Sequence, residues 1–269
     1  MTASRPGWFG ALLVAALTAA LLFLTLPIVA IFVDTGPLDL LGSLGEEGAL
    51  EALRLSLLCS AVAIAVIVLV GTPAAYLLAT RRFRGRAAIV TLVELPLVLP
   101  PAVAGIGLLA ALGPNGVLGG LIEDAGIRLV LTTTGVVLAL TFVAAPFYLR
   151  QAQAGFEAVD TTWLDASRTL GAGEARTFLH VAIPAAGPSL IAGFALAWGR
   201  ALGEFGATLM FAGSFRGITQ TVPLAIYERF STDFTGALAL SAVLVAISAA
   251  LLLSVKLLSG SAWLGGAAR

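Results

Sequence analysis

The chain has 269 residues, of which 59% are hydrophobic and 11% are charged, and its mean hydropathy is +1.03. A soluble globular domain carries roughly a quarter charged residues, so this composition excludes an ordinary soluble domain and indicates a protein surrounded by lipid. The 15 basic and 15 acidic residues balance, so the net charge does not indicate a nucleic-acid partner, and we expect none.

Six apolar segments follow one another along the chain. A helix that spans a bilayer needs about 20 predominantly apolar residues. The segments that meet this requirement are 8–33, 53–79, 87–112, 129–149, 186–212 and 235–258. The first is longer than the apolar part of a secretory signal, which is about 7–15 residues, so we expect an uncleaved first helix. The sequence therefore predicts an all-α polytopic membrane protein, a single transmembrane domain over 1–269 with six spanning helices.

Basic residues are distributed unequally between the two sides of these segments. One side receives Arg5, Arg81, Arg82, Arg84, Arg86, Arg150, Arg168, Arg176, Lys256 and Arg269. The other side receives Arg54, Arg128, Arg216 and Arg229, together with several acidic residues. Because positively charged loops stay in the cytoplasm, we expect the first side to be cytoplasmic. The prediction is a multi-pass protein of the inner or plasma membrane with both termini in the cytoplasm.

The connections on the outer side are 34–52, 113–128 and 213–234. The second contains Gly113-Pro114-Asn115-Gly116, which is typical of a turn. The third contains an apolar stretch at 222–227, for which a short interfacial helix is expected.

The long cytoplasmic connection, 150–185, is polar but patterned. Its apolar residues recur at spacings of three and four: Phe156, Val159, Trp163, Ala166 and Leu170. This spacing predicts an apolar stripe on a helix. Gly171 follows, where a left-handed residue would end that helix, and a second short helix is expected at about 173–181. Such helices can cover the membrane surface or bind another protein, and the acidic residues favour a protein partner because membrane-surface helices are usually rich in Lys and Arg.

The same connection carries a spaced motif. It reads Asp165-Ala166-Ser167, three residues, Gly171, nine residues, and Val181-Ala182-Ile183-Pro184. This resembles the motif of permease subunits of ABC importers, which is Glu-Ala-Ala, three residues, Gly, nine residues, and Ile-x-Leu-Pro. The spacing is the same, with Asp for Glu, Ser for Ala, Val for Ile and Ile for Leu. The resemblance implies a coupling helix that docks into a groove of a separate cytoplasmic ATPase.

The resemblance also implies roles for single residues. Trp163, Leu164 and Leu170 would anchor the ATPase, Asp165 and Arg168 would set the register, and Gly171 would let the two short helices fold back on each other. The full set of expected docking residues is Glu157, Trp163, Leu164, Asp165, Ala166, Ser167, Arg168, Leu170, Gly171 and Pro184.

Two further stretches indicate which permeases within this family the chain resembles. Leu95-Pro96-Leu97-Val98-Leu99-Pro100-Pro101 and 199–207 are similar to the permeases for molybdate/tungstate and for sulfate. The stretches 208–213 and 219–227 favour molybdate/tungstate. The resemblance implies the permease subunit of an ATP-driven molybdate or tungstate importer. It would work as a homodimer with two ATPase subunits, and an extracytoplasmic oxyanion-binding protein would deliver the anion to the outer loops.

Arg200 and Glu204 are charged residues in the fifth apolar segment. An unpaired charge at the centre of a spanning helix costs about 2.5–3.5 kcal/mol on insertion scales. Their spacing of four places both on one helical face, so we expect an ion pair. This pair either locks helix packing or lines the pathway, and both interpretations stay open. Proline and glycine in the third and fifth helices indicate either ordinary packing of small residues or the hinged walls of a pathway. On the second interpretation the expected pathway or gate residues are Pro100, Pro101, Gly105, Arg200, Gly203 and Glu204.

The chain is not expected to be an enzyme. A phosphate-binding loop needs Gly-x-x-x-x-Gly-Lys-Ser/Thr, and the only lysine, Lys256, is followed by Leu257. We expect no catalytic residue, no metal site and no cofactor on this chain, with ATP and Mg²⁺ bound by the partner ATPase. Cys59 is the only cysteine and His180 the only histidine, and we expect packing roles for both.

Three alternatives remain at this point. The nearest is a permease of the same family for sulfate or another anion. A secondary transporter or channel driven by an ion gradient would use Glu94 and Glu204 as its acidic residues, but it leaves the patterned 150–185 connection without a purpose. A structural subunit of a membrane complex is the weakest alternative.

Overall fold

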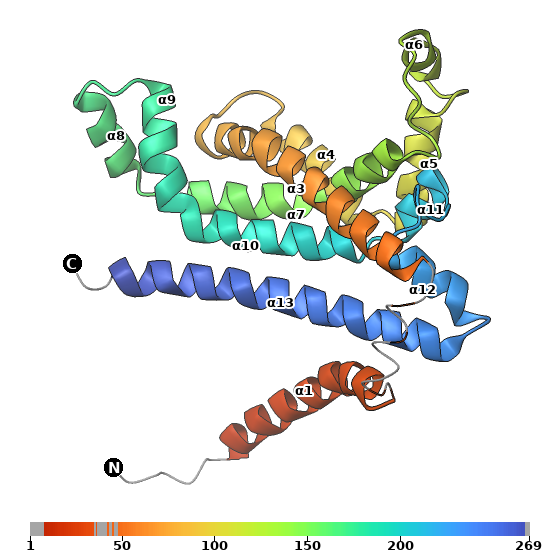
Figure 1. The fold of residues 1–269 in the computed structure, drawn as a ribbon. Coiled ribbons are helices and arrows are strands. Elements are labelled where there is room, and N and C mark those ends of the chain that lie inside the picture. Colours follow the sequence, from red (N-terminus) through yellow and green to blue (C-terminus); the bar gives the residue numbers. More distant parts are fainter. Residues whose placement is uncertain (1–7, 35, 37–41, 43–44, 46–47, 267–269) are drawn as a thin grey trace.

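The computed structural model describes residues 8–34, 36, 42, 45 and 48–266, and every regular element in these ranges is helical (Figure 1). The elements are α1 Trp8–Asp34, α3 Ala49–Thr80, α4 Arg86–Val98, α5 Pro101–Leu112, α6 Gly119–Asp124, α7 Thr133–Glu157, α8 Thr161–Thr169, α9 Glu174–Thr177, a π-helical turn Phe178–Ala182, α10 Ile183–Leu202, α11 Gly206–Ala212, α12 Val222–Phe230 and α13 Phe234–Gly266.

Five helices among the described residues are long and apolar enough to cross a membrane. They are α1, α3, α7, α13 and the continuous helix made by α9, the π-helical turn and α10. The remaining apolar segment, expected as one helix over 87–112, is divided into α4 and α5, which are bent by 119°. The division falls at Leu99 and Pro100. Proline has no N–H to donate, and its ring disfavours the helical conformation in the residue before it.

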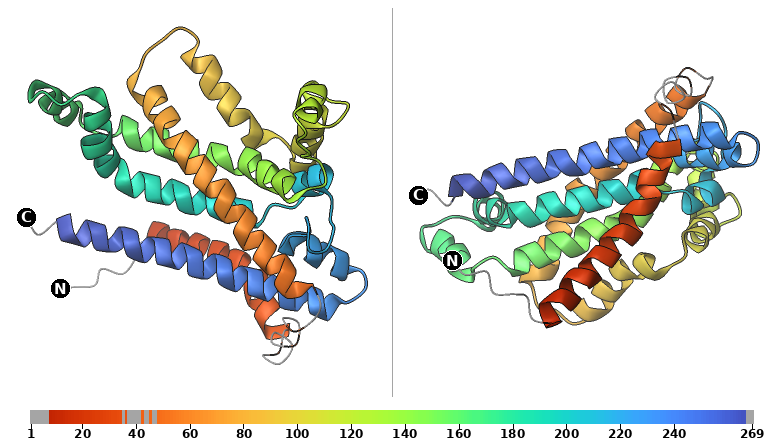
Figure 2. Two further views of the ribbon diagram at one scale, coloured as in Figure 1. Left: turned by 45° about the horizontal axis from the view of Figure 1, so that its top comes forward. Right: turned by 90° about the horizontal axis from the view of Figure 1, so that it is seen from below.

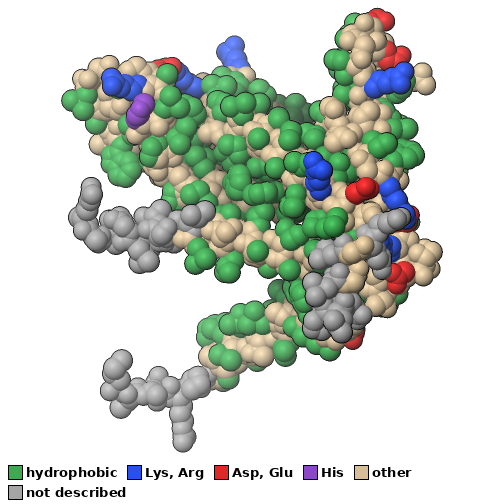
Figure 3. Space-filling model, in the orientation of Figure 1, with side chains coloured by type: hydrophobic (Ala, Val, Ile, Leu, Met, Phe, Trp, Pro, Cys, Tyr) green, Lys and Arg blue, Asp and Glu red, His purple; other side chains and the backbone are tan. Residues whose placement is uncertain are grey.

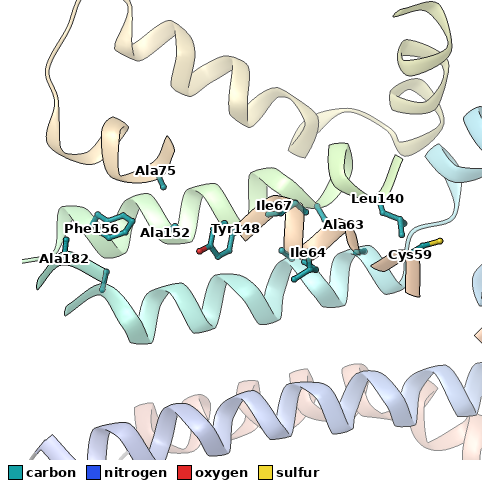
Figure 4. Packing of buried hydrophobic residues seen from close by; sticks show 14 of the residues in the cluster. Cys59, Ala63, Ile64, Ile67, Ala75, Leu140, Tyr148, Ala152, Phe156 and Ala182 are labelled. Carbon is teal, nitrogen blue, oxygen red and sulfur yellow. The ribbon is translucent and has the colours of Figure 1, made fainter. Parts of the chain in front are cut away.

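The core lies where α3, α7 and α10 pack together. Ile64, Ile67, Tyr148 and Phe156 fill the space between these helices (Figure 4). Many of the other buried positions are alanines, and small side chains let membrane helices approach closely. The buried Thr72 and Tyr148 hydroxyls lie 2.6 Å apart, so the phenol has a partner within the bundle.

α1 and α13 lie outside this core. α13 packs on α10 and α12, whereas α1 contacts α13 and has no buried residue. In Figure 1 α1 stands apart from the rest of the bundle. A helix that is apolar on all sides suits a lipid environment, so α1 meets lipid or another chain over most of its surface.

The two ends of the molecule differ. α8 and α9 project at one end, and α5, α6, α11 and α12 gather at the other (Figure 1). The start of α1 and the end of α13 lie toward the α8–α9 end in both views of Figure 2. Arg5 and Arg269, which contributed to the predicted orientation, lie outside the described residues, as does the Lys256 side chain.

Three predicted boundaries are corrected. α7 continues to Glu157, eight residues beyond the expected end of the fourth segment. The short helix expected at 173–181 is the beginning of the fifth spanning helix and not a separate element. The fifth segment, expected as one helix over 186–212, ends at Leu202 and resumes as α11. In the connections at 213–234 and 113–128, the expected helix at 222–227 is confirmed as α12, while α6 was not predicted.

Candidate functional site

α8 is a short helix that is capped at both ends. The Asp160 carboxylate accepts a hydrogen bond from the Thr162 N–H at 2.9 Å, which satisfies a free amide of the first turn. Hydrogen bonds from the Thr162 hydroxyl and N–H hold the pKa of Asp160 below its usual value. At the other end Gly171 has φ +84°, and the Ala172 N–H donates to the Ser167 carbonyl at 3.1 Å. This is the Schellman arrangement, so the predicted left-handed glycine is confirmed.

The apolar stripe expected over 156–170 is divided between two environments. Phe156 belongs to the last turn of α7 and Val159 to the turn before α8, and both are buried in the chain's own core. Trp163 and Leu170 are 57% and 88% exposed. The stripe is therefore not one surface, because the chain turns at Asp160 between its two parts.

The prediction that Leu164 anchors the ATPase is corrected. Its side chain is 5% exposed and packs in the core cluster of this chain. It therefore attaches α8 to the bundle and is not free to contact another protein. The exposed apolar side chains at this end of the molecule that the motif singled out are Trp163 and Leu170.

The other expected docking residues have local partners or lie at the surface. Arg168 and Asp165 form an ion pair of 3.0 Å on the exposed face of α8. The Ser167 hydroxyl lies 3.0 Å from the Thr177 hydroxyl and joins α8 to α9. Ala166 is exposed, and Pro184 is exposed within the first turn of α10.

Two ion pairs connect this region to the α3–α4 connection. Arg86 contacts Glu157 at 2.6 Å, and Arg81 pairs with Glu174. Glu157, expected as a docking residue, is thus already paired within the chain. The sequence interpretation used Arg81 and Arg86 only for orientation and missed both pairs. No spacing rule indicates them, because the partners are 93 and 71 positions apart.

A single helix links α8 and its surroundings to the far end of the molecule. The stretch Glu174–Leu202 is 29 residues long and contains α9, the π-helical turn and α10. The two short helices at 161–177 are therefore not equivalent, because α8 is separate while α9 is the tip of a spanning helix.

After Leu202 the fifth apolar segment is interrupted, as the third segment is at Leu99 and Pro100. Gly203, Glu204 and Phe205 separate α10 from α11, and α11 packs on α5 directly after the Pro100 break. The two helices touch through glycine: a Cβ at Gly105 would lie 2.6 Å from Met210 Cβ, which is closer than real Cβ contacts. Pro101 and Gly105 of the third segment thus lie against α11, which begins just after the break that contains Gly203 and Glu204.

The expected Arg200–Glu204 ion pair is present, with Nη2 and Oε2 2.6 Å apart. Its setting differs from the prediction, because Glu204 lies in the break and not on the helix that carries Arg200. The Glu204 side chain is 1% exposed, and its Oε1 accepts a hydrogen bond from the Ala207 N–H of α11 at 2.7 Å. Arg200 is 26% exposed. The pair therefore joins the end of α10 to the first turn of α11.

The connection between α11 and α12 carries, together with α12, a group of polar side chains that the sequence did not single out. Arg216 contacts Glu228 at 2.9 Å, and Gln220 also hydrogen-bonds Glu228. Arg216 lies beside Gly48 at the start of α3. Within the described residues no cluster of three or more His, Cys, Asp or Glu side chains suits a metal ion.

The sequence family described as "binding-protein-dependent transport system inner membrane component" matches residues 67–262 of this chain. The chain is 38% identical over 237 residues to the molybdenum transport system permease protein ModB of Mycobacterium tuberculosis, covering 88% of this chain and 90% of the relative. It is 35% identical over 206 residues to the sulfate transport system permease protein CysW of Synechococcus elongatus, covering 75% and 72%.

The fold is also known among solved structures. A chain of a bacterial alginate ABC transporter, crystallised with a pentasaccharide-bound periplasmic protein, superposes with a TM-score of 0.72 at 16% identity. The superposition covers 93% of this chain and 92% of the other. At this identity the likeness concerns the fold alone.

Proposed function

Because the chain belongs to the family of binding-protein-dependent transport system inner membrane components, we propose that it is the permease subunit of an ATP-driven importer for molybdate or tungstate. In this role it forms the passage through the membrane and transmits movement from a separate ATPase. ATP is bound and hydrolysed by that ATPase.

The observation that carries the choice of substrate is the similarity to a molybdenum permease. That relative matches at higher identity than the sulfate permease and over more of both chains. Molybdate and tungstate are tetrahedral dianions of the same charge, so one passage suits both. We propose that an extracytoplasmic binding protein selects the anion and delivers it to the outer loops at 34–52, 113–128 and 213–234.

We place the ATPase contact on α8. Trp163 and Leu170 expose large apolar surfaces there, and solvent-exposed apolar patches rimmed by polar residues mark interaction sites. The exposed Asp165–Arg168 pair lies on the same short helix and would place charged groups beside the apolar part of the contact. Each of two ATPase subunits would receive one α8, which requires a second copy of this chain.

The proposed transmission runs from α8 to the breaks. Leu164 and the Ser167–Thr177 contact hold α8 against the bundle and α9. The continuous helix Glu174–Leu202 then leads to Gly203, where Glu204 holds both α10 and α11. Since α11 packs on α5, movement at α8 changes the angle at both breaks and alternates access between the two sides of the membrane.

Transport in vesicles tests this proposal. The permease is reconstituted with its ATPase and its binding protein, and uptake of molybdate is measured with and without ATP. The expected result is uptake that requires ATP, ATPase and binding protein together, and that tungstate inhibits. Molybdate uptake driven by a proton or sodium gradient without the ATPase would contradict the proposal and favour a secondary transporter.

A sulfate permease is the second candidate, because the chain is also 35% identical to a sulfate permease. The same vesicles distinguish the two functions. For a molybdate importer, an excess of sulfate leaves molybdate uptake unchanged. If sulfate is transported in preference to molybdate, the substrate assignment fails while the importer role remains.

A further inference from the structure

A groove lies at the α8–α9 end of the molecule, between the last turns of α3 and the loop that carries the family motif. Its volume is about 490 Å³, and its wall on α3 is formed by Pro73, Tyr76, Leu77 and Thr80. Leu77 is 51% exposed. The opposite rim is formed by Arg81, Arg168 and Glu174. The groove thus has an apolar wall on a spanning helix and a charged rim where that helix ends.

The arginines of the rim are only weakly neutralised by their ion-pair partners. Arg81 pairs with Glu174 and Arg168 with Asp165, but both carboxylates are 71% exposed. Exposed ion pairs of this kind contribute little to stability, so the two guanidinium groups can change partner easily. Arg82 and Arg84 follow directly in the chain, and none of the ion pairs found among the described residues includes them.

The turn beside the groove has the composition of a membrane boundary. Phe83 lies between Arg82 and Arg84 and is 40% exposed. Aromatic rings and basic side chains gather at the level of lipid headgroups, and basic clusters next to a spanning helix attract anionic lipids. Figure 3 shows arginine side chains along this upper edge, above a hydrophobic surface.

From these features we infer that the groove binds an anionic phospholipid. The phosphodiester contacts Arg81 and Arg168, since guanidinium groups bind phosphate oxygens with paired hydrogen bonds. The upper part of an acyl chain lies along Pro73, Tyr76 and Leu77. This site goes beyond the proposed transport function, although it places this end of the bundle at the cytoplasmic surface.

A bound lipid has a structural consequence. The Tyr76 ring packs against Phe178 and Phe156, at centroid distances of 4.7 and 5.3 Å. Phe178 begins the π-helical turn that follows α9. A lipid against Tyr76 and Arg168 therefore contacts α3 and α8 at once and restrains α8 relative to the bundle.

The binding test uses the full-length permease in detergent and native mass spectrometry. Phosphatidylglycerol and phosphatidylcholine with identical acyl chains are added separately, and retained lipid is counted. We expect tighter retention of phosphatidylglycerol. The double substitution Arg81→Gln and Arg168→Gln should weaken that retention by about tenfold, as expected for the loss of charge-assisted contacts. Arg216→Gln is the matched control, because Arg216 is also exposed and paired but lies at the opposite end.

A second pair of variants tests the apolar wall. Leu77→Gln should lower the retention of phosphatidylglycerol, whereas Leu69→Gln should not, because Leu69 is 78% exposed on the same helix away from the groove. Both positions are at the surface, so both variants should fold. Soluble glycerol phosphate is the third probe and distinguishes a lipid from a free phosphate ligand.

Four results would overturn the inference. Equal retention of the two lipids, or unchanged retention in the double arginine variant, would remove the headgroup site. Displacement of the lipid by glycerol phosphate alone would show a site for a soluble phosphate. Loss of the lipid when the ATPase is added would show that the ATPase, and not lipid, occupies the groove in the complex.

Discussion

Glu204 connects two helices through one buried carboxylate. Oε2 lies 2.6 Å from the Arg200 guanidinium, and Oε1 accepts the Ala207 N–H at 2.7 Å. A buried charge is tolerated only when it is paired or hydrogen-bonded; here Oε1 is hydrogen-bonded, whereas the buried Oε2 has the ion pair with Arg200 and no hydrogen bond. Gly203 is the first residue of the break, and Glu204 follows it directly. The pair therefore has a structural role across the break, whether or not the anion passes beside it.

Substitutions at Arg200 and Glu204 measure the contribution of each contact to stability. Arg200→Ala leaves a buried carboxylate without its cation, which typically costs about 3–5 kcal/mol. Glu204→Gln keeps an acceptor for Ala207 and should cost less than Glu204→Ala. The double substitution of Arg200 and Glu204 to Ala should be less destabilising than the sum of the single changes. Thermal unfolding in detergent ranks the variants by stability. Strictly additive losses of stability in the double variant would show that the two residues act independently.

Gly171 is the second residue with a specific requirement. Its φ of +84° strains any β-branched residue by about 1–2 kcal/mol, and a Cβ there would meet no atom. Gly171→Val should therefore distort the end of α8 without affecting the core. We expect ATP hydrolysis that no longer drives molybdate uptake. Gly173→Val is the control, because Gly173 has φ −66° and equally open surroundings. Equal uptake by the two variants would contradict this role.

Asp160 adds a pH dependence at the start of α8. Its pKa is lowered by the hydrogen bonds from Thr162, so the carboxylate stabilises the helix above the ordinary aspartate pKa. That contribution is lost as the pH falls through the lowered pKa. Asp160→Asn keeps an acceptor and should remove the pH dependence. Hydrogen exchange of the first-turn amides of α8 in both proteins measures the effect, and identical pH profiles would contradict it.

At the scale of elements, the contact between α5 and α11 tolerates little added volume. A Cβ at Gly105 would approach Met210 Cβ and the Ala207 carbonyl oxygen to 2.6 and 2.7 Å. A Cβ at Gly206 would lie 2.9 Å from Pro101 Cβ. The two short helices, each directly after a break, therefore approach this closely only because Gly105 and Gly206 have no side chain.

Replacing Gly105 with Ala should push α5 away from α11. Overpacking of this kind costs about 1–3 kcal/mol, so Gly105→Ala should lower the unfolding temperature and reduce ATP-driven uptake. Gly107→Ala is the matched control in the same helix, because a Cβ at Gly107 meets no atom within 4 Å. If Gly105→Ala transports like the control, the close contact is not required for movement.

At the scale of the whole molecule, the two ends have different chemistry. The α8–α9 end joins the basic α3–α4 connection through the Arg81–Glu174 and Arg86–Glu157 pairs. The other end carries α6, α11 and α12. Cysteine labelling can assign each end to a side of the membrane, because the only native cysteine, Cys59, is 2% exposed.

Trp163→Cys and Val117→Cys provide the two labelling sites. Trp163 is on α8, and Val117 is 87% exposed in the loop before α6. In sealed, right-side-out vesicles, a membrane-impermeant maleimide should label Val117→Cys from outside and Trp163→Cys only after the vesicles are opened. Addition of the ATPase should then protect Trp163→Cys alone. Labelling of Trp163→Cys from outside would reverse the proposed orientation, and unprotected labelling would refute the α8 contact.

Local information in the sequence was sufficient for the helices, the membrane environment and the family motif. Apolar length predicts spanning helices because every backbone amide in lipid must be paired within the helix. The position of Gly171 predicted the left-handed end of α8 for a similarly local reason. Proline density in the third segment indicated looser helix there, but the 119° bend depends on what α4 and α5 pack against.

Only the tertiary structure decided which residues meet. The sequence predicted an Arg200–Glu204 pair on one helix, whereas the chain ends α10 first and uses Glu204 to cap α11. It suggested Leu164 as a free anchor, but burial against the core shows the opposite orientation. The pairs that hold Arg81 and Arg86 lie far apart in sequence. Helix formation depends on neighbouring residues, whereas contacts between helices depend on packing that no local pattern contains.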